Sequence, residues 1–242
     1  MLSSPAVPAT SDPAAPLRLR IVMPTLDEAE RLPATLERAL EEGDEIVVSD
    51  GGSRDATVAL ARSLGAHVIE GPAGRGLQLE RGARLDSGSP WDIVLFLHAD
   101  TLLPTGAGAG VRQAVADGAV GGGFEVRFDG ARRLYRLGDR LVSWRTRLTQ
   151  CPLGDQAQFV RREVFEQLGG IQPFPILEDL DLARRLKRAG RIAILSPPVS
   201  TSSRRYDRQG IVATVALNWT IWALYALGVK PRRLARLYRQ IR

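Results

Sequence analysis

Acidic side chains stand at several points where an apolar stretch of the chain ends, and these residues are the best suited to chemistry. Asp100 comes three residues after the apolar run 93–97, so a buried strand would deliver its carboxylate to a polar turn. One carboxylate at such a place is enough for Mg²⁺ or Mn²⁺ when substrate phosphates and waters supply the remaining oxygens. A simple turn or cap role explains Asp100 equally well when the residue is taken alone.

Two other acidic positions also allow two interpretations. Asp50 ends the apolar run 45–49, and its carboxylate can accept a hydrogen bond from a nucleobase N–H or from nearby backbone. Glu178, Asp179 and Asp181 place three carboxylates within four residues. Acids are favoured in the first turn of a helix by its dipole. A carboxylate at a helix start is also well placed to act as general base for a hydroxyl acceptor.

Several common catalytic patterns are missing from the sequence. It has no G-x-G-x-x-G and no G-x-x-x-x-G-K-[ST] segment, which argues against dehydrogenases and P-loop NTPases. It has no G-x-S-x-G elbow, and only His67 and His98 could serve a catalytic triad. The single cysteine, Cys151, excludes a disulfide scaffold and a structural zinc site, so a metal would be held by oxygen.

The elements that must position these residues alternate between strands and helices. Strands are predicted at 19–23, 45–49, 66–70 and 93–97, and helices at 28–42, after a cap at Asp55 or Thr57, at 77–86 and at 106–116. This alternation predicts an α/β fold with a mainly parallel sheet flanked by helices. Ligands of such sheets bind beyond the carboxyl ends of the strands. That rule selects the segments 24–28, 50–53, 71–76 and 98–100.

The second half of the chain has a different pattern, and its elements need not continue the parallel order. We expect strands at 120–128 and 158–160, and helices at 132–148, 162–168 and 180–189. No repeat or linker divides the chain. The sequence therefore predicts one domain over 18–203, whose first half holds one ligand and whose second half helps to hold another.

The two ends of the chain differ from this domain in composition. The chain has 242 residues, 44% of them hydrophobic, which excludes a disordered or fibrous protein. Its net charge of +6 resides in the segment 204–242, so nucleic acid is not an expected partner. That segment is predicted to be a basic helical extension packed on the same domain. Its uncharged part, 211–229, suits a buried helix, a helix on a membrane surface or, less well, a membrane span.

The start of the chain indicates where the protein resides. Residues 1–17 have no apolar signal core and predict a disordered tail. We therefore expect a cytoplasmic protein, with the inner face of the cell membrane as a further location if the segment 211–229 meets a membrane.

Taken together, the candidate residues resemble the family 2 glycosyltransferases, which have the GT-A type nucleotide-sugar-binding fold. The resemblance covers nearly the whole chain from about Leu19. It is carried in order by Pro24-Thr25-Leu26-Asp27-Glu28, Asp50-Gly51-Gly52-Ser53-Arg54-Asp55, Arg75-Gly76, His98-Ala99-Asp100, Gly154-Asp155-Gln156 and Glu178-Asp179. The stretches 154–170 and 203–205, with Asn218-Trp219, look closest to a small bacterial subgroup labelled as radical-SAM/selenodomain-associated transferases.

The resemblance implies a role for each matching residue. On the donor side it places Pro24, Thr25 and Glu28 in the nucleotide pocket, Asp50 against the base, usually uracil, and Gly51, Arg75 and Ala99 beside the donor. It makes Asp100 the metal-binding carboxylate and Asp179 the catalytic base. It puts Gly154, Asp155, Gln156 and Glu178 on the acceptor side. Arg204 and Arg205 suit the diphosphate, although a solvated basic turn explains them as well.

His98 departs from the family pattern, because it stands where the metal motif often has its first Asp. We expect it to line the pocket or end the strand, and metal ligation is the less favoured alternative.

The sequence therefore predicts an inverting, metal-dependent transfer of a sugar from a nucleoside-diphosphate donor, UDP-linked, to a hydroxyl acceptor that is a lipid or a small molecule. A sugar-nucleotide-forming nucleotidyltransferase is the enzymatic alternative, but its Gly-rich phosphate loop with a following Lys is not evident in a chain with two lysines. A membrane-associated nucleotide-sugar binder without turnover is the non-enzymatic alternative. The sequence predicts neither the sugar nor the oligomeric state.

Overall fold

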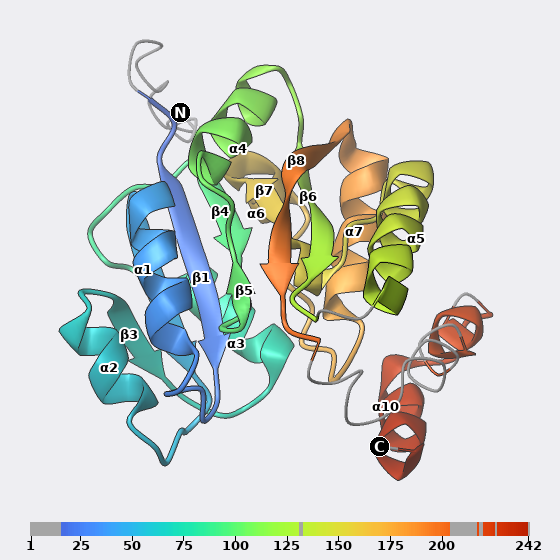
Figure 1. The fold of residues 1–242 in the computed structure, drawn as a ribbon, viewed down its shortest axis with the longest axis horizontal. Helices are drawn as coiled ribbons and strands as arrows, with labels where there is room; N and C mark the ends of the chain where they lie inside the picture. The colour runs from blue at the N-terminus through green and yellow to red at the C-terminus, as the bar shows by residue number, and fades with distance from the viewer. Residues whose placement is uncertain (1–15, 131–132, 204–216, 218–219, 226, 242) are drawn as a thin grey trace, which may run out of the picture.

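The computed structural model describes residues 16–130, 133–203, 217, 220–225 and 227–241 (Figure 1). The first half of the chain forms β1 (Leu19–Thr25), α1 (Leu32–Glu42), β2 (Glu45–Asp50), α2 (Thr57–Ser63), β3 (His67–Glu70), α3 (Arg75–Ala83), β4 (Ile93–Phe96), β5 (Thr101–Leu102) and α4 (Ala107–Ala116). The second half forms β6 (Gly121–Phe128), α5 (Arg133–Thr149), the short 3₁₀ helix η1 (Gly154–Gln156), β7 (Phe159–Arg161), α6 (Arg162–Gln167), α7 (Glu178–Ala189), β8 (Ile192–Thr201) and α10 (Pro231–Ile241).

The strands form one sheet in the order β3-β2-β1-β4-β7-β6-β8-β5. The strands β3, β2, β1 and β4 are parallel to their neighbours, and so are β6 and β8. The short strand β7 runs antiparallel to both β4 and β6, and β5 runs antiparallel to β8. The predicted mainly parallel sheet is therefore confirmed, and β7 forms a seam between its two parallel parts.

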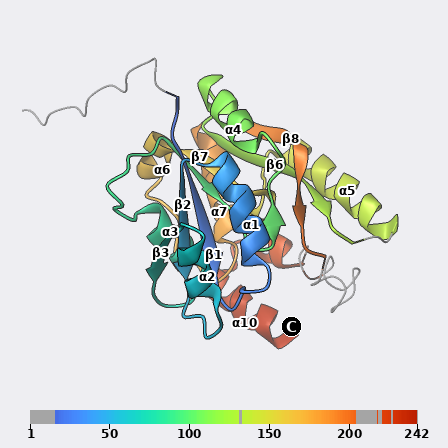
Figure 2. The same ribbon diagram turned by 60° about the vertical axis from the view of Figure 1, so that its left-hand side comes forward.

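Helices cover both faces of the sheet (Figure 2). Side chains from α1, α2 and α4 pack on one face with Ile21, and side chains from α3, α6 and α7 pack on the other with Val22. The two core residues are adjacent because successive strand side chains point to opposite faces. Burial of one such aliphatic side chain stabilises the fold by about 1.5–3 kcal/mol.

Three consecutive glycines in β6 allow the backbone of the neighbouring segments to approach closely. A Cβ on Gly121 would lie 2.6 Å from the carbonyl oxygen of Phe159 in β7, and one on Gly122 would overlap the carbonyl oxygen of Ala193 in β8. A Cβ on Gly123 would lie 2.6 Å from Cβ of Pro152. All three distances are shorter than van der Waals contact, so side chains here would push β6 away from β7, from β8 and from the segment at Pro152.

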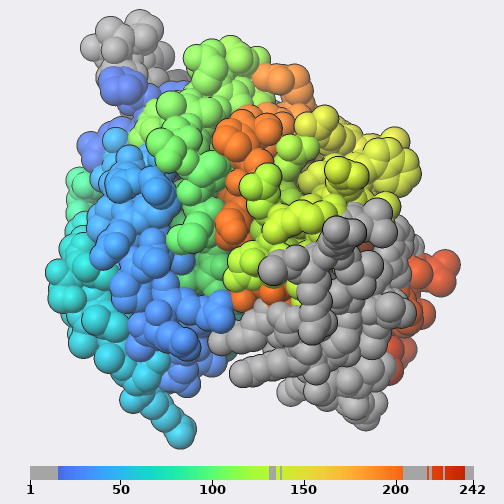
Figure 3. All heavy atoms as spheres, viewed as in Figure 1, coloured from blue at the N-terminus to red at the C-terminus, as the bar shows by residue number. Residues whose placement is uncertain are grey.

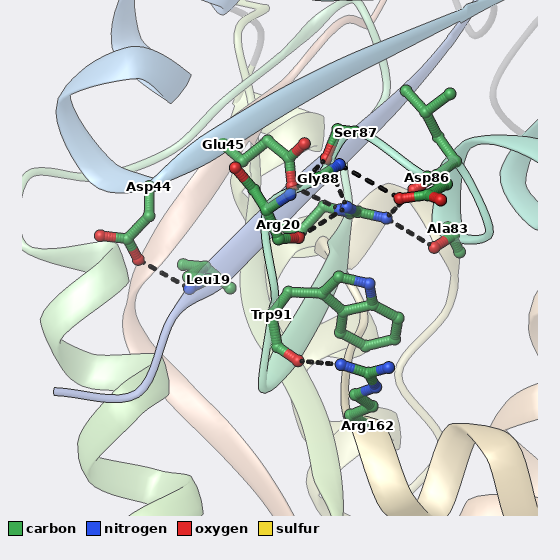
Figure 4. A network of polar contacts seen from close by, with 12 residues as sticks. Leu19, Arg20, Asp44, Glu45, Ala83, Asp86, Ser87, Gly88, Trp91 and Arg162 are labelled. Carbon is green, nitrogen blue, oxygen red and sulfur yellow. Dashed lines mark hydrogen bonds and ion pairs between the residues drawn. The ribbon is translucent and has the colours of Figure 1, made fainter. Parts of the chain in front are cut away.

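A buried arginine stabilises the edge of the sheet where the parallel strands begin (Figure 4). Arg20 donates from Nε to Oε2 of Glu45 at 2.7 Å and from Nη1 to the carbonyl oxygen of Ala83 at 2.8 Å. The Trp91 ring lies between the guanidinium groups of Arg20 and Arg162, at 5.5 and 5.2 Å from its centroid. Since ligands of parallel sheets bind at the opposite edge, this network is structural.

Several element boundaries differ from the sequence-based expectation. Helix α1 begins at Leu32 and not at residue 28, because residues 28–31 form turns before Pro33, which is tolerated in a first helical turn. Helix α3 covers 75–83 in place of 77–86. The predicted cap of α2 is wrong: its N-cap residue is Ala56, which makes no side-chain cap bond, although Asp55 accepts a hydrogen bond from the Thr57 N–H.

Two strands were not predicted from the sequence. The strand β8 contains Pro197 and Pro198, which normally argue against a strand. The pairing of β6 with β8 shifts register between Phe124 and Val126, where the partner in β8 changes from Leu195 to Val199. The prolines therefore occupy a bulge, where no ladder hydrogen bond is lost. The strand β5 has only two residues, too few for a pattern.

Several predicted segments fall outside the described residues. These are nearly all of the tail 1–17, Arg204 and Arg205, and about half of the segment 211–229. In the described part of that segment, the Tyr225 hydroxyl donates to Oδ1 of Asp181 at 3.4 Å, and the Arg145 guanidinium lies 5.0 Å from the Trp222 ring centroid. Within the part of the chain that the structure describes, no helix has the length and apolar character needed to cross a membrane. The division of the chain into tail, domain and extension stays a prediction.

Candidate active site

The carboxyl ends of β1, β2 and β4 meet at one edge of the sheet, the lower edge in Figure 1. Thr25 and Asp50 are register partners at the ends of the parallel strands β1 and β2. Gln78 of α3 joins these ends, because its Nε2 donates to the carbonyl oxygens of Thr25 and Ser49 at 2.8 and 2.9 Å. Three of the segments selected from the sequence thus lie at the same edge.

The Asp50 carboxylate holds the loop that follows β2. Its Oδ1 accepts hydrogen bonds from the hydroxyls of Thr25 and Ser53, at 2.9 and 2.5 Å. Its Oδ2 accepts from the N–H groups of Gly52 and Ser53, at 2.8 and 2.7 Å. Burial acts to raise the pKa of Asp50, but these hydrogen bonds outweigh burial and lower it. Asp50 is fully buried, so in this structure it organises the loop, and its contact with a nucleobase stays a prediction.

The loop after β1 is joined to the segment after Asp50. The Asp27 N–H donates to the Ser53 hydroxyl at 2.9 Å, and Oδ1 of Asp27 accepts from the Arg54 N–H at 2.7 Å. The Glu28 N–H donates to the Thr57 hydroxyl at 2.9 Å. These hydrogen bonds hold the loop after β1 against the segment that follows Asp50.

Asp179 lies in the first turn of α7, and its carboxylate accepts two hydrogen bonds and forms one ion pair. Its Oδ1 accepts from the Leu180 N–H at 2.7 Å, and its Oδ2 accepts from the Gly154 N–H at 3.0 Å. Nη2 of Arg75 lies 3.3 Å from the same Oδ2. Burial acts to raise the pKa of Asp179, but the Arg75 charge and the two backbone N–H groups outweigh it and lower the pKa. The carboxylate is therefore ionised at neutral pH.

Glu178 and Asp179 differ in exposure although they are neighbours. The Glu178 side chain is 1% exposed and pairs with Nε of Arg75, whereas the Asp179 side chain is 13% exposed. Burial raises the pKa of Glu178 against the opposing charge of Arg75. The Arg75 side chain itself is 41% exposed, so a ligand can reach the cation that holds both acids.

Gly154, in η1, brings His98 and Asp179 together. A Cβ at Gly154 would lie 3.0 Å from both Oδ2 of Asp179 and Nε2 of His98. Burial, and then the charge of Arg75, lower the pKa of His98 to about 4, so its imidazole is neutral at pH 7. Glycine at this position therefore lets the two side chains approach the backbone of η1 closely, where a larger residue would crowd both.

Asp155, next to Gly154 in η1, has an unsatisfied oxygen. Its buried Oδ1 has no hydrogen-bond donor among the described residues. Burial raises the pKa of Asp155, with Arg145 acting against it and Asp179 adding to it. A buried acceptor without a donor is costly, which makes this oxygen a candidate contact for a ligand hydroxyl.

Two glutamines fix the loop that carries Gly154. Gln156 is fully buried; its Oε1 accepts from the Thr146 hydroxyl at 2.9 Å and its Nε2 donates to the Phe124 carbonyl at 2.8 Å. Nε2 of Gln158 donates to the carbonyl oxygens of Pro152 and Asp179, at 2.8 and 2.9 Å. In this structure Gln156 positions the loop and has no side-chain surface to offer an acceptor.

Asp100 is a partly exposed residue in the turn that follows β4. A hydrogen bond of 3.1 Å from the Thr101 N–H to the His98 carbonyl closes this turn. Among the described residues, no group of three His, Cys, Asp or Glu side chains could hold a metal ion. A site with a single protein carboxylate fits Mg²⁺ or Mn²⁺ when a diphosphate and waters complete the oxygen ligands.

The structure brings most of the predicted site residues to this edge, with different exposure. Pro24, Glu28, Gly51, Asp100 and Asp155 are partly exposed, Thr25, Asp50, Ala99, Gly154, Gln156 and Glu178 are buried, and Arg75 is exposed. Sequence reasoning did not identify Gln78 or Gln158, because their partners are backbone carbonyls and no motif marks them.

Comparison with known proteins identifies the family of the chain. A family profile described as glycosyl transferase family 2 matches residues 20–169. No curated protein sequence matches the chain.

Three solved structures have a similar fold. S. aureus TarS 1–349 is 17% identical, with a TM-score of 0.58 over 84% of this chain and 66% of that chain, just under two thirds of its length. The mannosyltransferase PcManGT from Pyrobaculum calidifontis, in complex with GDP-Man and Mn²⁺, is 19% identical, with a TM-score of 0.60 over 97% and 72%. Glucosyl-3-phosphoglycerate synthase from Mycobacterium tuberculosis, in complex with Mn²⁺, UDP and phosphoglyceric acid, is 23% identical, with a TM-score of 0.52 over 77% and 68%. At these identities the likeness concerns the fold, and the expected GT-A type α/β fold is confirmed.

Proposed function

The chain belongs to glycosyl transferase family 2, and on this premise we propose that it transfers a sugar from a nucleoside-diphosphate donor to a hydroxyl acceptor with inversion at the anomeric carbon. The observation that carries the proposal is the environment of Asp179. It is an ionised carboxylate at a helix start, more exposed than Glu178 and close enough to Asp155, which has an unsatisfied Oδ1, for the charge of Asp179 to raise the pKa of Asp155. Such a group can accept a proton from a hydroxyl held next to it.

The reaction proceeds as a single displacement. The acceptor hydroxyl binds against Asp155 and gives its proton to Oδ1 of Asp179, which retains a free lone pair beside the Leu180 hydrogen bond. The hydroxyl oxygen forms a bond with the anomeric carbon as the bond from that carbon to the diphosphate oxygen breaks. The products are the glycosylated acceptor and the nucleoside diphosphate. No covalent intermediate with the protein is needed, so the configuration inverts.

The leaving diphosphate gains negative charge during this step. Asp100 would hold Mg²⁺ or Mn²⁺, which supplies charge neutralisation at the diphosphate when bound. Arg75 is exposed enough to contact the same group from α3. Arg204 and Arg205 are proposed as further diphosphate contacts, since a guanidinium group suits phosphate oxygens.

We propose that uracil is the base of the nucleotide donor. It is supported by the glucosyl-3-phosphoglycerate synthase complex with UDP, whereas the mannosyltransferase complex contains GDP-Man. The base would stack against the loop that Asp50 organises. We further propose that the chain belongs to the radical-SAM/selenodomain-associated subgroup and acts on a lipid or small-molecule acceptor. We propose a cytoplasmic location, with the inner face of the cell membrane as a further one.

The test is a binding and turnover series with the purified chain. We expect UDP to raise the apparent unfolding temperature with Mn²⁺ more than without it, because a ligand of the native state stabilises it by mass action. Asp100→Ala is expected to abolish the metal-dependent part of UDP affinity in calorimetry and to leave the fold intact. Release of UDP from a UDP-sugar separates the enzyme from a non-catalytic binder. Release of pyrophosphate, or unchanged metal-dependent binding by Asp100→Ala, would contradict the proposal.

A further inference from the structure

A cavity of about 690 Å³ lies between α5, α7 and the helical residues 220–225, and neither Gly154 nor Asp179 is among its lining residues. We call it the cationic pocket, and its lining residues are Leu148, Thr149, Cys151, Leu180, Arg184, Lys187, Arg188, Trp222 and Tyr225. The lining combines apolar and aromatic side chains with three basic ones. This composition fits a ligand with both an apolar part and a negative charge.

The three basic side chains of the cationic pocket carry positive charge that no described carboxylate neutralises. Arg184, Lys187 and Arg188 are exposed, and none forms an ion pair within the described residues. Lys187 donates to the carbonyl oxygen of Thr149 at 2.8 Å. The nearby carboxylate of Asp181 is already paired with Arg185 at 2.7 Å. The Arg184 guanidinium lies 5.3 Å from the Tyr225 ring centroid, so a bound anion would meet three cations that have polar or aromatic neighbours but no carboxylate partner among the described residues.

An apolar strip on α5 leads to this pocket. Leu141, Trp144 and Leu148 are 55%, 64% and 67% exposed. Their spacing of three and four residues places them on one face of the helix. We call these three residues the α5 strip. Val142 packs toward the core, so the strip faces outward, and Figure 3 shows α5 side chains, in yellow, at the surface. Leu148 belongs to both the strip and the pocket.

We propose that the cationic pocket and the α5 strip bind phosphate-bearing lipids at the surface of an anionic membrane. The pocket cations match the headgroup phosphate, and Leu148, Trp222 and the strip match the start of the acyl chains. A free phosphate would use the cations and leave the apolar residues exposed. Helices with Trp and Leu on one side and basic residues beside them bind membrane interfaces in this way.

The cationic pocket and the α5 strip are the surface at which the proposed membrane contact forms. Only the consequence for the acceptor, that a lipid could enter the site from the membrane, rests on the proposed function. Leu180 lines the pocket and directly follows Asp179. A membrane at this surface would therefore lie beside the acceptor side of the site, and a lipid acceptor could enter from it.

The experiment is flotation of the full chain with vesicles of phosphatidylcholine, with and without phosphatidylglycerol. We expect flotation with the anionic vesicles alone, and loss of it at high salt. Arg184→Gln with Arg188→Gln is expected to weaken partitioning roughly thirtyfold, the product for two basic residues near an anionic surface. The matched control, Arg38→Gln with Arg62→Gln, removes equal charge from exposed positions on α1 and α2 and is expected to float like wild type.

The apolar part is tested by Trp144→Ser, which should weaken flotation, against Leu40→Ser on α1, which should not.

Equal flotation of the pocket variants and wild type overturns the proposal, as does wild type that stays unbound. Binding of inorganic phosphate without flotation would assign the pocket to a soluble anion. A dimer that Trp144→Ser dissociates, without flotation, would assign the strip to a second copy. UDP-sugar hydrolysis in solution should be unchanged in every variant; its absence in wild type would refute the proposed function and leave the flotation result standing.

Discussion

Asp179→Asn tests which acid of α7 accepts the proton. A general base contributes about 10²- to 10⁴-fold, so kcat should fall by that factor, equivalent to roughly 3–5 kcal/mol in the barrier. The substitution also disturbs the hydrogen bonds around residue 179. Asp179 accepts from the Leu180 N–H on one oxygen and from the Gly154 N–H on the other, so the asparagine NH₂ must face one of these donors. That mismatch costs about 1–3 kcal/mol and should appear as a lower unfolding temperature.

Two variants of the same helix separate catalysis from stability. Asp181→Asn also removes a charge from the first turn of α7, but Asp181 pairs with Arg185 and accepts from Tyr225, away from Gly154. It should lower stability and leave kcat near wild type. Glu178→Gln loses its ion pair with Arg75 and should act through the position of that arginine, with a smaller effect on kcat than Asp179→Asn.

The assay is release of nucleoside diphosphate, with water as the acceptor until a natural one is known. Donor KM should change little for Asp179→Asn, because the lost group acts on the acceptor. Thermal unfolding of each variant identifies any that fail to fold. If Asp179→Asn keeps near-wild-type turnover while Glu178→Gln is inactive, the base is Glu178 and the reasoning from exposure and pKa is refuted.

Three further predictions concern the site and its support. Gly154→Ala should lower kcat by about 10²-fold in a folded protein, because its Cβ must displace Asp179 or His98, and unchanged turnover would show that the position of Asp179 against Gly154 is not needed for the reaction. Arg75→Gln should move the acid limb of the kcat profile to higher pH, because Arg75 lowers the pKa of Asp179 and keeps it ionised as pH falls; a limb at the same pH would remove that role. Arg20→Met should destabilise the fold by about 3–5 kcal/mol in urea unfolding, because it leaves Glu45 buried without its partner, and a second change, Glu45→Gln, should recover part of the loss.

The sequence predicted the positions of the acidic residues better than their partners. Asp100 and Asp179 could be found because strand ends and helix starts have local patterns. The function of Asp50 in the loop could not be decided, because one of its four donors, the Thr25 hydroxyl, reaches it only through the pairing of β1 with β2. The glutamines at 78 and 158 were missed for the same reason, since tertiary structure alone brings backbone carbonyls to them.

The limits of fold prediction had a similar origin. Alternating strands and helices predicted the parallel part of the sheet, because each βα unit is local in sequence. The strand β8 pairs with β6 around a bulge that contains two prolines, and a local pattern does not indicate which strand lies beside it.

The three glycines of β6 have a consequence for how the enzyme tolerates mutation. Asp100 lies between β4 and β5, which stand on opposite sides of β7 in the sheet, and Asp179 begins the helix that leads into β8. The spacing of the proposed metal-binding and proton-accepting groups therefore depends on how tightly β6, β7 and β8 pack. A methyl group at Gly122 would separate these strands, and a shift of about 1 Å in reacting groups can cost on the order of 10²-fold in rate. In a saturation mutagenesis screen, positions 121–123 should therefore reject even alanine, and among variants that still fold, activity should be lost before stability.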